Sequence, residues 1–209
     1  MAKLLYIESS PRKDRSSSIQ AAREFLRAYE QENPKDEVEV LDLWSYPLPE
    51  FDGNTLNAKY RILHGEEHSP EETEAWGAVI KVVEHFNSAQ KYLFSLPMWN
   101  FGIPYKLKHY IDVLTQPGLT FSFSPDTGYS GLVTGKPAVV VYARGGEYSS
   151  SPAVKNYDYQ KPYLEMWLGF IGFTDIRPII VEPTLADPET VKQAQASALK
   201  LAADAARGI

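Results

Sequence analysis

The fold of this chain is decided by residues 92–104, which read YLFSLPMWNFGIP. The apolar run at 92–96 predicts a buried strand, and Pro97 ends that strand. A helical pattern of apolar residues follows: Leu107, Tyr110, Ile111 and Leu114. A buried strand that leads through a loop into a helix is the unit of a parallel α/β sheet, and such sheets bind ligands in the loops at the carboxyl ends of their strands.

The loop itself offers a distinctive combination of side chains. Met98, Trp99 and Phe101 provide flat apolar surface, and Asn100 adds a group that both donates and accepts hydrogen bonds. This combination suits a planar heterocycle with polar edges. The alternative is an ordinary strand-to-helix turn, in which the prolines end the elements and the aromatic side chains only pack.

Further strands and helices alternate on both sides of this stretch. Buried strands are predicted at 3–8, 38–43, 138–142 and 176–181, with helices between them. Ser69, followed by Pro70 and by Glu72, predicts a capped helix start, and an alanine-rich helix is expected over 188–206. Five strands that alternate with helices predict a doubly wound five-stranded parallel sheet within a single domain, residues 1–209.

Two segments are longer than ordinary connections. Residues 44–68 and 116–135 are expected to be long loops, a class that often carries function. In the second segment, the alternation at 119–123 and the turn residues at 126–128 predict a small hairpin.

Residues 9–18, SSPRKDRSSS, follow the first strand and lead into a helix. Hydroxyl groups beside the free N–H groups of a helix start form an anion site. The loop lacks the glycines that let a backbone approach a pyrophosphate, so it suits a terminal phosphate monoester such as that of FMN. The alternative is a serine cap on a helix with a solvated basic face.

A third loop, Arg144-Gly145-Gly146, follows the fourth strand. Two glycines allow the backbone to approach a ligand closely. The three loops are expected at one edge of the sheet, where they would supply phosphate donors, aromatic surface with an amide, and bare backbone N–H groups. A flavin needs this set of contacts.

Composition and motifs exclude several other classes of function. The net charge of −6 argues against nucleic-acid binding, and zero cysteines exclude disulfides and thiolate metal sites. The apolar run 4–7 is too short for a signal sequence or a membrane span, so we expect a cytoplasmic protein with no membrane contact. We expect no metal site at His64 and His68, because Gly65 and the helix start at Ser69 place them in a loop.

The chain resembles the FMN-dependent NAD(P)H azoreductases, a family related to the NAD(P)H:quinone reductases. The similarity is carried by residues 9–18, 97–104, 107–112, 118–121, 144–146 and 168–172. Trp99 stands where the family commonly has tyrosine, and Ala143 where serine is frequent. The resemblance implies a flavodoxin-like fold with strand order 2-1-3-4-5 and a homodimer whose sites are completed by the partner chain.

By position, the resemblance also implies the residues of an FMN site. The phosphate and ribityl chain would be bound by Ser10, Ser16, Ser17 and Ser18. The isoalloxazine would be contacted by Pro97, Met98, Trp99, Asn100 and Phe101, and its other edge by Arg144, Gly145 and Gly146. The groups that would stabilise charge in the reduced ring are Asn100, Gly145 and Gly146.

The expected activity is therefore ping-pong hydride transfer through FMN from NADH or NADPH to a quinone or an azo compound. The alternatives are a flavodoxin-like electron carrier and a flavin-binding module without turnover. The apolar loop at 44–51 gives a physical reason to expect a homodimer, because a lone domain has no obvious means to bury it. Alternatively, this loop folds back over the edge of its own sheet.

Overall fold

A parallel sheet forms the centre of the molecule in the computed structural model, which describes residues 1–209 except the side chain of Leu63. Its strands lie in the order β2-β1-β3-β6-β7, which matches the expected order 2-1-3-4-5 along the chain. Their bounds are Lys3–Glu8 for β1, Glu37–Asp42 for β2, Lys91–Pro97 for β3, Ala138–Ala143 for β6 and Ile176–Val181 for β7. Every residue of β6 is buried, which explains its unbroken apolar sequence.

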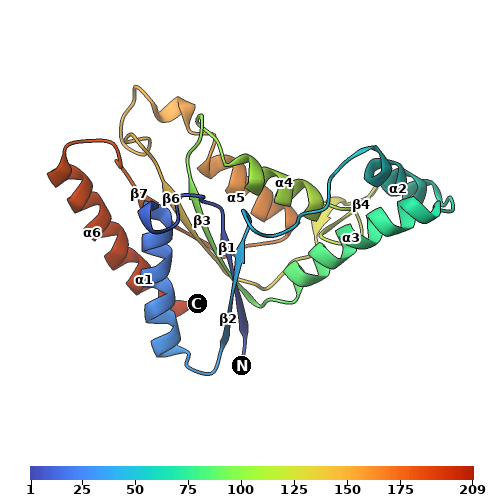
Figure 1. Ribbon diagram of the computed structural model, residues 1–209, viewed down its shortest axis with the longest axis horizontal. Helices are drawn as coiled ribbons and strands as arrows, with labels where there is room; N and C mark the ends of the chain where they lie inside the picture. Colours follow the sequence, from blue (N-terminus) through green and yellow to red (C-terminus); the bar gives the residue numbers. More distant parts are fainter.

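Helices cover both faces of this sheet (Figure 1). One face carries α1 (Ser17–Glu32) and α6 (Pro188–Ala205), which pack on Leu4, Leu93 and Val139. The opposite face carries α3 (Pro70–Asn87), α4 (Tyr105–Leu114) and α5 (Lys161–Ile171). Because side chains alternate along a strand, neighbouring residues of each strand enter different cores.

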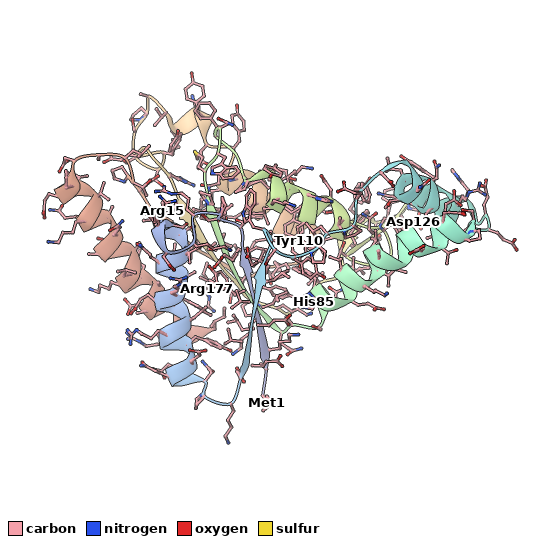
Figure 2. All side chains as sticks on the ribbon, in the orientation of Figure 1. Met1, Arg15, His85, Tyr110, Asp126 and Arg177 are labelled. Atoms are coloured by element: carbon pink, nitrogen blue, oxygen red, sulfur yellow. The ribbon has the colours of Figure 1, made fainter. Side chains whose placement is uncertain are left out.

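The core around α3, α4 and α5 is rich in aromatic side chains (Figure 2). Tyr110 of α4 is fully buried within it, and the ring centroid of Phe86 lies 6.2 Å from that of Tyr110. Burial raises the pKa of Tyr110 well above its ordinary value, so this phenol stays neutral.

Several predicted local features are confirmed. The N–H of Glu72 donates to the Ser69 hydroxyl, and the Glu72 carboxylate accepts from the Ser69 N–H, so the capping box is formed. The expected hairpin consists of β4 (Phe121–Ser124) and β5 (Gly128–Gly131). A Cβ at Gly131 would lie 2.3 Å from the backbone nitrogen of Gly172, so only glycine allows the hairpin to lie this close to the end of α5.

The prediction of a continuous loop over 44–68 is wrong, because helix α2 (Gly53–His64) lies within it. The side chain of Asp52 caps α2 by accepting from the Thr55 N–H at 3.0 Å, and Gly65 ends the helix in the left-handed conformation at φ 71°. His64 is therefore the last helical residue rather than part of a loop.

The apolar segment before α2 lies against its own chain. Tyr46, Leu48 and Phe51 pack on the core around α3, as the alternative for this segment predicted. All three side chains remain partly exposed there.

Three short 3₁₀ turns complete the chain, at Lys13–Arg15 (η1), Lys155–Tyr157 (η2) and Ala206–Gly208 (η3). Among the helices of the described chain, none has both the length and the apolar composition that crossing a membrane requires.

Candidate functional site

The loops after β1, β3 and β6 meet at one edge of the sheet and enclose a cavity of about 170 Å³. Its lining includes Ser10, Arg12, Ser16, Ser17, Pro97, Met98, Trp99, Ala143, Gly145, Thr184 and Leu185. A neighbouring hollow of about 300 Å³ shares part of this lining and adds Asn100, Phe101 and Tyr148. The cavity lies where β1 and β3 are adjacent, which is the point where the strand order reverses and where open α/β sheets bind ligands.

A larger hollow of about 470 Å³ lies along the outer strand β2, beside Tyr46 and His85. It is away from the reversal point, and the carboxylates that line it, Glu39 and Asp42, are already paired. The Glu39 carboxylate pairs with Lys3 at 2.5 Å and with His85 Nε2 at 2.7 Å. The cavity between the three loops is therefore the better candidate.

The phosphate end of this cavity is formed by the start of α1. Ser16 occupies the N-cap position, but its side chain makes no capping hydrogen bond with the helix. Its Oγ instead lies 3.1 Å from the Oγ of Ser18, which is fully buried. The alternative of a simple serine cap at Ser16 therefore does not describe this loop. The Ser16 hydroxyl makes no bond to the helix, and the positive end of the α1 dipole favours an anion beside it.

The four predicted serines do not play the same part. Ser10, Ser16 and Ser17 line the cavity. Ser18 does not appear in the lining of the cavity, and its hydroxyl forms a hydrogen bond with the hydroxyl of Ser16.

The turn after β3 holds Asn100 and Phe101 in a strained conformation. The N–H groups of Trp99 and Gly102 donate to each other's carbonyl oxygens at 3.0 Å, so the two residues between them form a tight turn. Asn100 has φ 47° and Phe101 has φ 72°. Left-handed backbone at residues other than glycine is costly and gathers at functional sites, and here it leaves the Asn100 amide and the Phe101 ring exposed.

Trp99 belongs to an aromatic cluster that connects two loops. The ring centroids of Trp44 and Trp99 lie 5.8 Å apart, and Tyr105 packs edge-on against Trp44 at 5.5 Å. The indole N–H of Trp44 donates to the carbonyl oxygen of Ser9 at 3.0 Å. Trp44 thus couples the loop after β1 to the aromatic turn. The apolar sequence of 44–51 predicts an interface role for Trp44, but its position directly after the second strand is a signal for this site.

The third loop is held by Arg144, whose side chain is fully buried. The guanidinium lies 2.9 Å from the Asp158 carboxylate, 3.4 Å from that of Glu182, and donates to Gln160 Oε1 at 3.1 Å. It is absent from the described lining of both hollows. The buried Arg144 side chain therefore holds the loop in place through Asp158, Gln160 and Glu182. It does not line the cavity, where a residue that contacts the ligand would lie.

The loop after β7 also reaches the site. This contribution is not among the expectations from the sequence. The N–H of Thr184 donates to the carbonyl oxygen of Arg144 at 2.8 Å, and that of Leu185 donates to Gly145 at 3.0 Å. A Cβ at Gly145 would lie 3.0 Å from Leu185 Cδ1, so glycine keeps this part of the cavity open. The sequence does contain a signal for this loop, because the fifth parallel strand must end at the same edge of the sheet as the others.

These residues fit a flavin mononucleotide. Hydroxyl groups and a helix N-terminus match a phosphate monoester, the Met98 and Trp99 side chains match a flat ring, and Gly145 leaves its backbone accessible. The Asn100 amide is exposed at the rim, where a ring edge with both donors and acceptors would lie.

Comparison with known proteins agrees with this geometry. The sequence profile described as the flavodoxin-like fold matches residues 2–205. An FMN-dependent NADH:quinone oxidoreductase of Desulfotalea psychrophila is 52% identical over 198 residues, which is 95% of this chain and 93% of that protein. A protein of the same description from Nitratidesulfovibrio vulgaris is 49% identical over 97% of both chains.

Solved structures give the same relationship. An azoreductase from Bacillus anthracis superposes with a TM-score of 0.92 at 30% identity and covers 100% of both chains. An FMN-dependent NADH-azoreductase of the same organism, in complex with FMN, superposes with a TM-score of 0.89 at 29% identity, over 99% of this chain and 98% of that one. This chain belongs to the flavodoxin-like family that contains these FMN-dependent NADH:quinone oxidoreductases.

Proposed function

We propose that this protein is an FMN-dependent oxidoreductase that transfers electrons from NADH to quinones and azo compounds. The observation that carries the proposal is the cavity between the loops after β1, β3 and β6, which joins a serine-lined anion end to an aromatic turn. Relatives at up to 52% identity carry the description FMN-dependent NADH:quinone oxidoreductase, and a structural neighbour is an FMN-dependent NADH-azoreductase.

Each loop has a separate part in binding. We assign the phosphate to Ser10, Ser16, Ser17 and the N-terminus of α1, with Ser18 orienting Ser16. We assign the ring to Pro97, Met98, Trp99, Asn100 and Phe101, and its far edge to the backbone of Gly145. Gly146 follows Gly145 in the chain but lies outside the described lining of both hollows, and we assign its backbone N–H to the same edge. Arg144 belongs to the site as the residue that holds this last loop in place.

Bound FMN supplies hydride acceptance and donation, so the chain needs no acid–base pair of its own. Its residues orient the ring and stabilise charge at the ring edge. Asn100 and the N–H groups of Gly145 and Gly146 are the groups we assign to that stabilisation. Met98, Phe101 and Leu185 line the adjoining hollow and give an apolar surface to the face at which NADH and the acceptor exchange.

An electron carrier of the flavodoxin type is the competing function, and a flavin-binding module without turnover is the third. The hollow of about 300 Å³ beside the ring site favours an enzyme, since a carrier has no small substrate to accommodate. Steady-state oxidation of NADH with menadione separates these functions. Rapid turnover without another protein supports the enzyme, whereas bound FMN with negligible turnover supports a carrier or a module. Parallel assays with NADPH establish the nicotinamide preference.

We also propose that residues 1–209 form one doubly wound FMN-binding domain that acts as a cytoplasmic homodimer. Helices on both sheet faces support the doubly wound fold. Exposed aromatic side chains near the site, including Phe101, Tyr157 and Tyr159, support a second copy that covers it. Light scattering should give twice the chain mass of 23.5 kDa. Full turnover by a monomer would refute the shared site.

A further inference from the structure

Lys13 has an unusual conformation within the loop that leads to α1. It opens the short turn η1 with a left-handed backbone, φ 49°. Its Nζ lies 2.6 Å from Glu8 Oε1 and 2.6 Å from Asp42 Oδ1. Left-handed backbone is unfavourable for lysine, so these contacts must offset a local conformational cost.

The two carboxylates come from neighbouring strands. Glu8 ends β1, Asp42 ends β2, and the two are direct partners in the parallel register. The Glu8 side chain is nearly buried, so two adjacent negative charges would repel each other strongly without a cation between them. Burial alone would lower the pKa of Lys13, but its bonds to Asp42 and Glu8 outweigh this and raise it. Lys13 therefore remains an ammonium ion.

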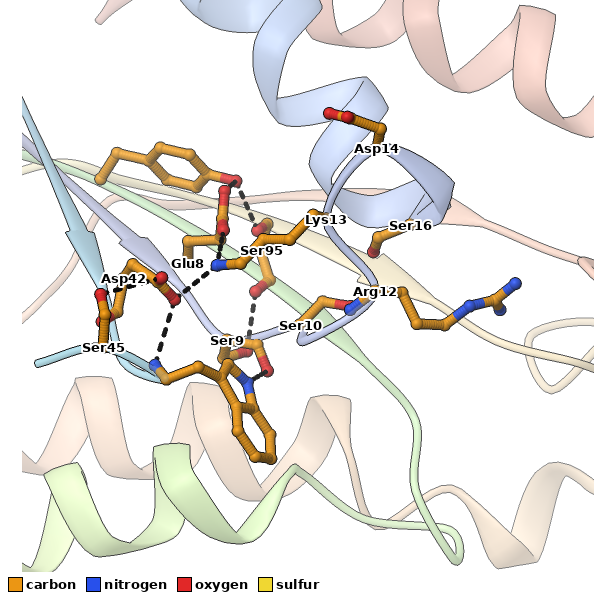
Figure 3. A network of polar contacts seen from close by, with 12 residues as sticks. Glu8, Ser9, Ser10, Arg12, Lys13, Asp14, Ser16, Asp42, Ser45 and Ser95 are labelled. Carbon is orange, nitrogen blue, oxygen red and sulfur yellow. Dashed lines mark hydrogen bonds and ion pairs between the residues drawn. The ribbon is translucent and has the colours of Figure 1, made fainter.

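Lys13 points away from the cavity. Figure 3 shows its side chain extending toward Glu8 and Asp42, whereas Arg12 extends in the opposite direction. Arg12 and Ser16 line the cavity, and Lys13 does not appear in that lining. An ammonium group held by two carboxylates at 2.6 Å is not placed to bind a phosphate directly.

The same cluster connects to the rest of the site. The backbone N–H of Trp44 donates to Asp42 Oδ1 at 3.1 Å, and its indole N–H donates to Ser9 at 3.0 Å. Ser9 Oγ also donates to the Ser95 carbonyl oxygen at 2.8 Å, which links the loop to β3 (Figure 3). The position of Lys13 thus affects both the serine loop and the tryptophan beside the ring site.

We propose that Lys13 is a positioning residue for the flavin phosphate: it fastens the serine loop to the ends of β1 and β2 and offsets one of the two carboxylate charges at those strand ends. This inference rests on the proposed FMN cofactor. It implies that the serines and the α1 N-terminus hold a dianion more tightly because the Lys13 ammonium group lowers the summed negative charge of Glu8 and Asp42 by one.

Lys13→Met tests the charge balance, with Lys3→Met as the matched control. Lys3 pairs with Glu39 and so also joins β1 to β2, but it lies at the opposite end of β1. FMN and riboflavin, which lacks the phosphate, are titrated into the flavin-free protein, and their dissociation constants are measured by fluorescence quenching. We expect K13M to bind FMN about tenfold more weakly, which corresponds to one net charge at the phosphate. Riboflavin binding by K13M and FMN binding by K3M should be unchanged.

A triple variant distinguishes charge balance from direct contact. In E8Q/D42N/K13M the cation and both carboxylates are removed, which leaves this cluster one charge unit more positive than in the parent, so FMN affinity should recover to the parent value or above.

Unchanged FMN affinity in K13M would overturn the inference, as would equal losses for FMN and riboflavin. A triple variant as weak as K13M would show that Lys13 contacts the phosphate itself. If K13M does not fold, the FMN affinity of the triple variant is compared with that of the parent. An affinity well below the parent value would overturn the inference. A parent protein that binds neither flavin would instead refute the proposed function.

Discussion

Replacing the two cavity-lining serines at the start of α1, Ser16→Ala with Ser17→Ala, should weaken FMN binding without a matching loss of stability. A hydrogen bond to a charged group contributes about 1.5–3 kcal/mol, so losing two at the lower value raises the dissociation constant roughly 100-fold. Ser16 makes no capping bond to α1, but its loss leaves the buried Ser18 hydroxyl without a partner, so the flavin-free variant should lose about 1–2 kcal/mol of unfolding free energy, less than the loss in FMN binding. Fluorescence titration with FMN and urea unfolding of the flavin-free protein measure the two quantities.

Ser69→Ala is the matched control, because Ser69 does cap its helix and lies far from the cavity in sequence. That variant should lose about 1 kcal/mol, which lowers Tm by about 2–4 °C for a domain of this size, and keep its FMN affinity. The reasoning is refuted if the double serine variant binds FMN as tightly as the parent, or if S69A weakens FMN binding to the same degree.

Asn100→Ala should slow the reduction of bound flavin by NADH in stopped-flow experiments. Asn100→Gly, which suits φ 47°, should slow it equally if the amide matters; a slow N100A beside a normal N100G would show that only the turn matters. Arg144→Met should cost about 3–5 kcal/mol in urea unfolding, because it leaves the Asp158 and Glu182 carboxylates without their buried cation; a loss below about 1 kcal/mol would contradict this role. The Ala2 N–H, the Tyr29 hydroxyl and Lys91 lower the pKa of Asp36 to about 2. Asp36→Asn should therefore be less stable than the parent above about pH 4, with the difference vanishing as the pH falls toward the lowered pKa, and a difference independent of pH would contradict it.

The strands of the central sheet could be predicted from the sequence because their signals are local. The bounds of β1 and β7 were predicted as observed, and β6 extends one residue beyond its apolar run. The Ser69 capping box also depends on four adjacent residues. Helix α2 was missed because its packing against α3, rather than a strong pattern of its own, holds it in place.

The location of the site could be predicted from the sequence, but the full set of its residues and their orientations could not. Loops that follow successive parallel strands must gather at one edge, so the serine loop, the aromatic turn and the glycine pair could be placed together. The orientation of Arg144 could not be predicted, because its partners Asp158 and Glu182 are distant in the chain. The same holds for Leu185, whose contact with Gly145 depends on how the last loop folds back.

The measurement that tests the central claim most directly is anaerobic reduction of the purified, FMN-loaded protein by NADH, followed by mixing with menadione. We predict that NADH bleaches the flavin absorbance and that menadione restores it within the same preparation, without any added protein. Flavin that stays oxidised with NADH, or that is reduced only when a separate reductase is added, would contradict the assignment as an NADH:quinone oxidoreductase.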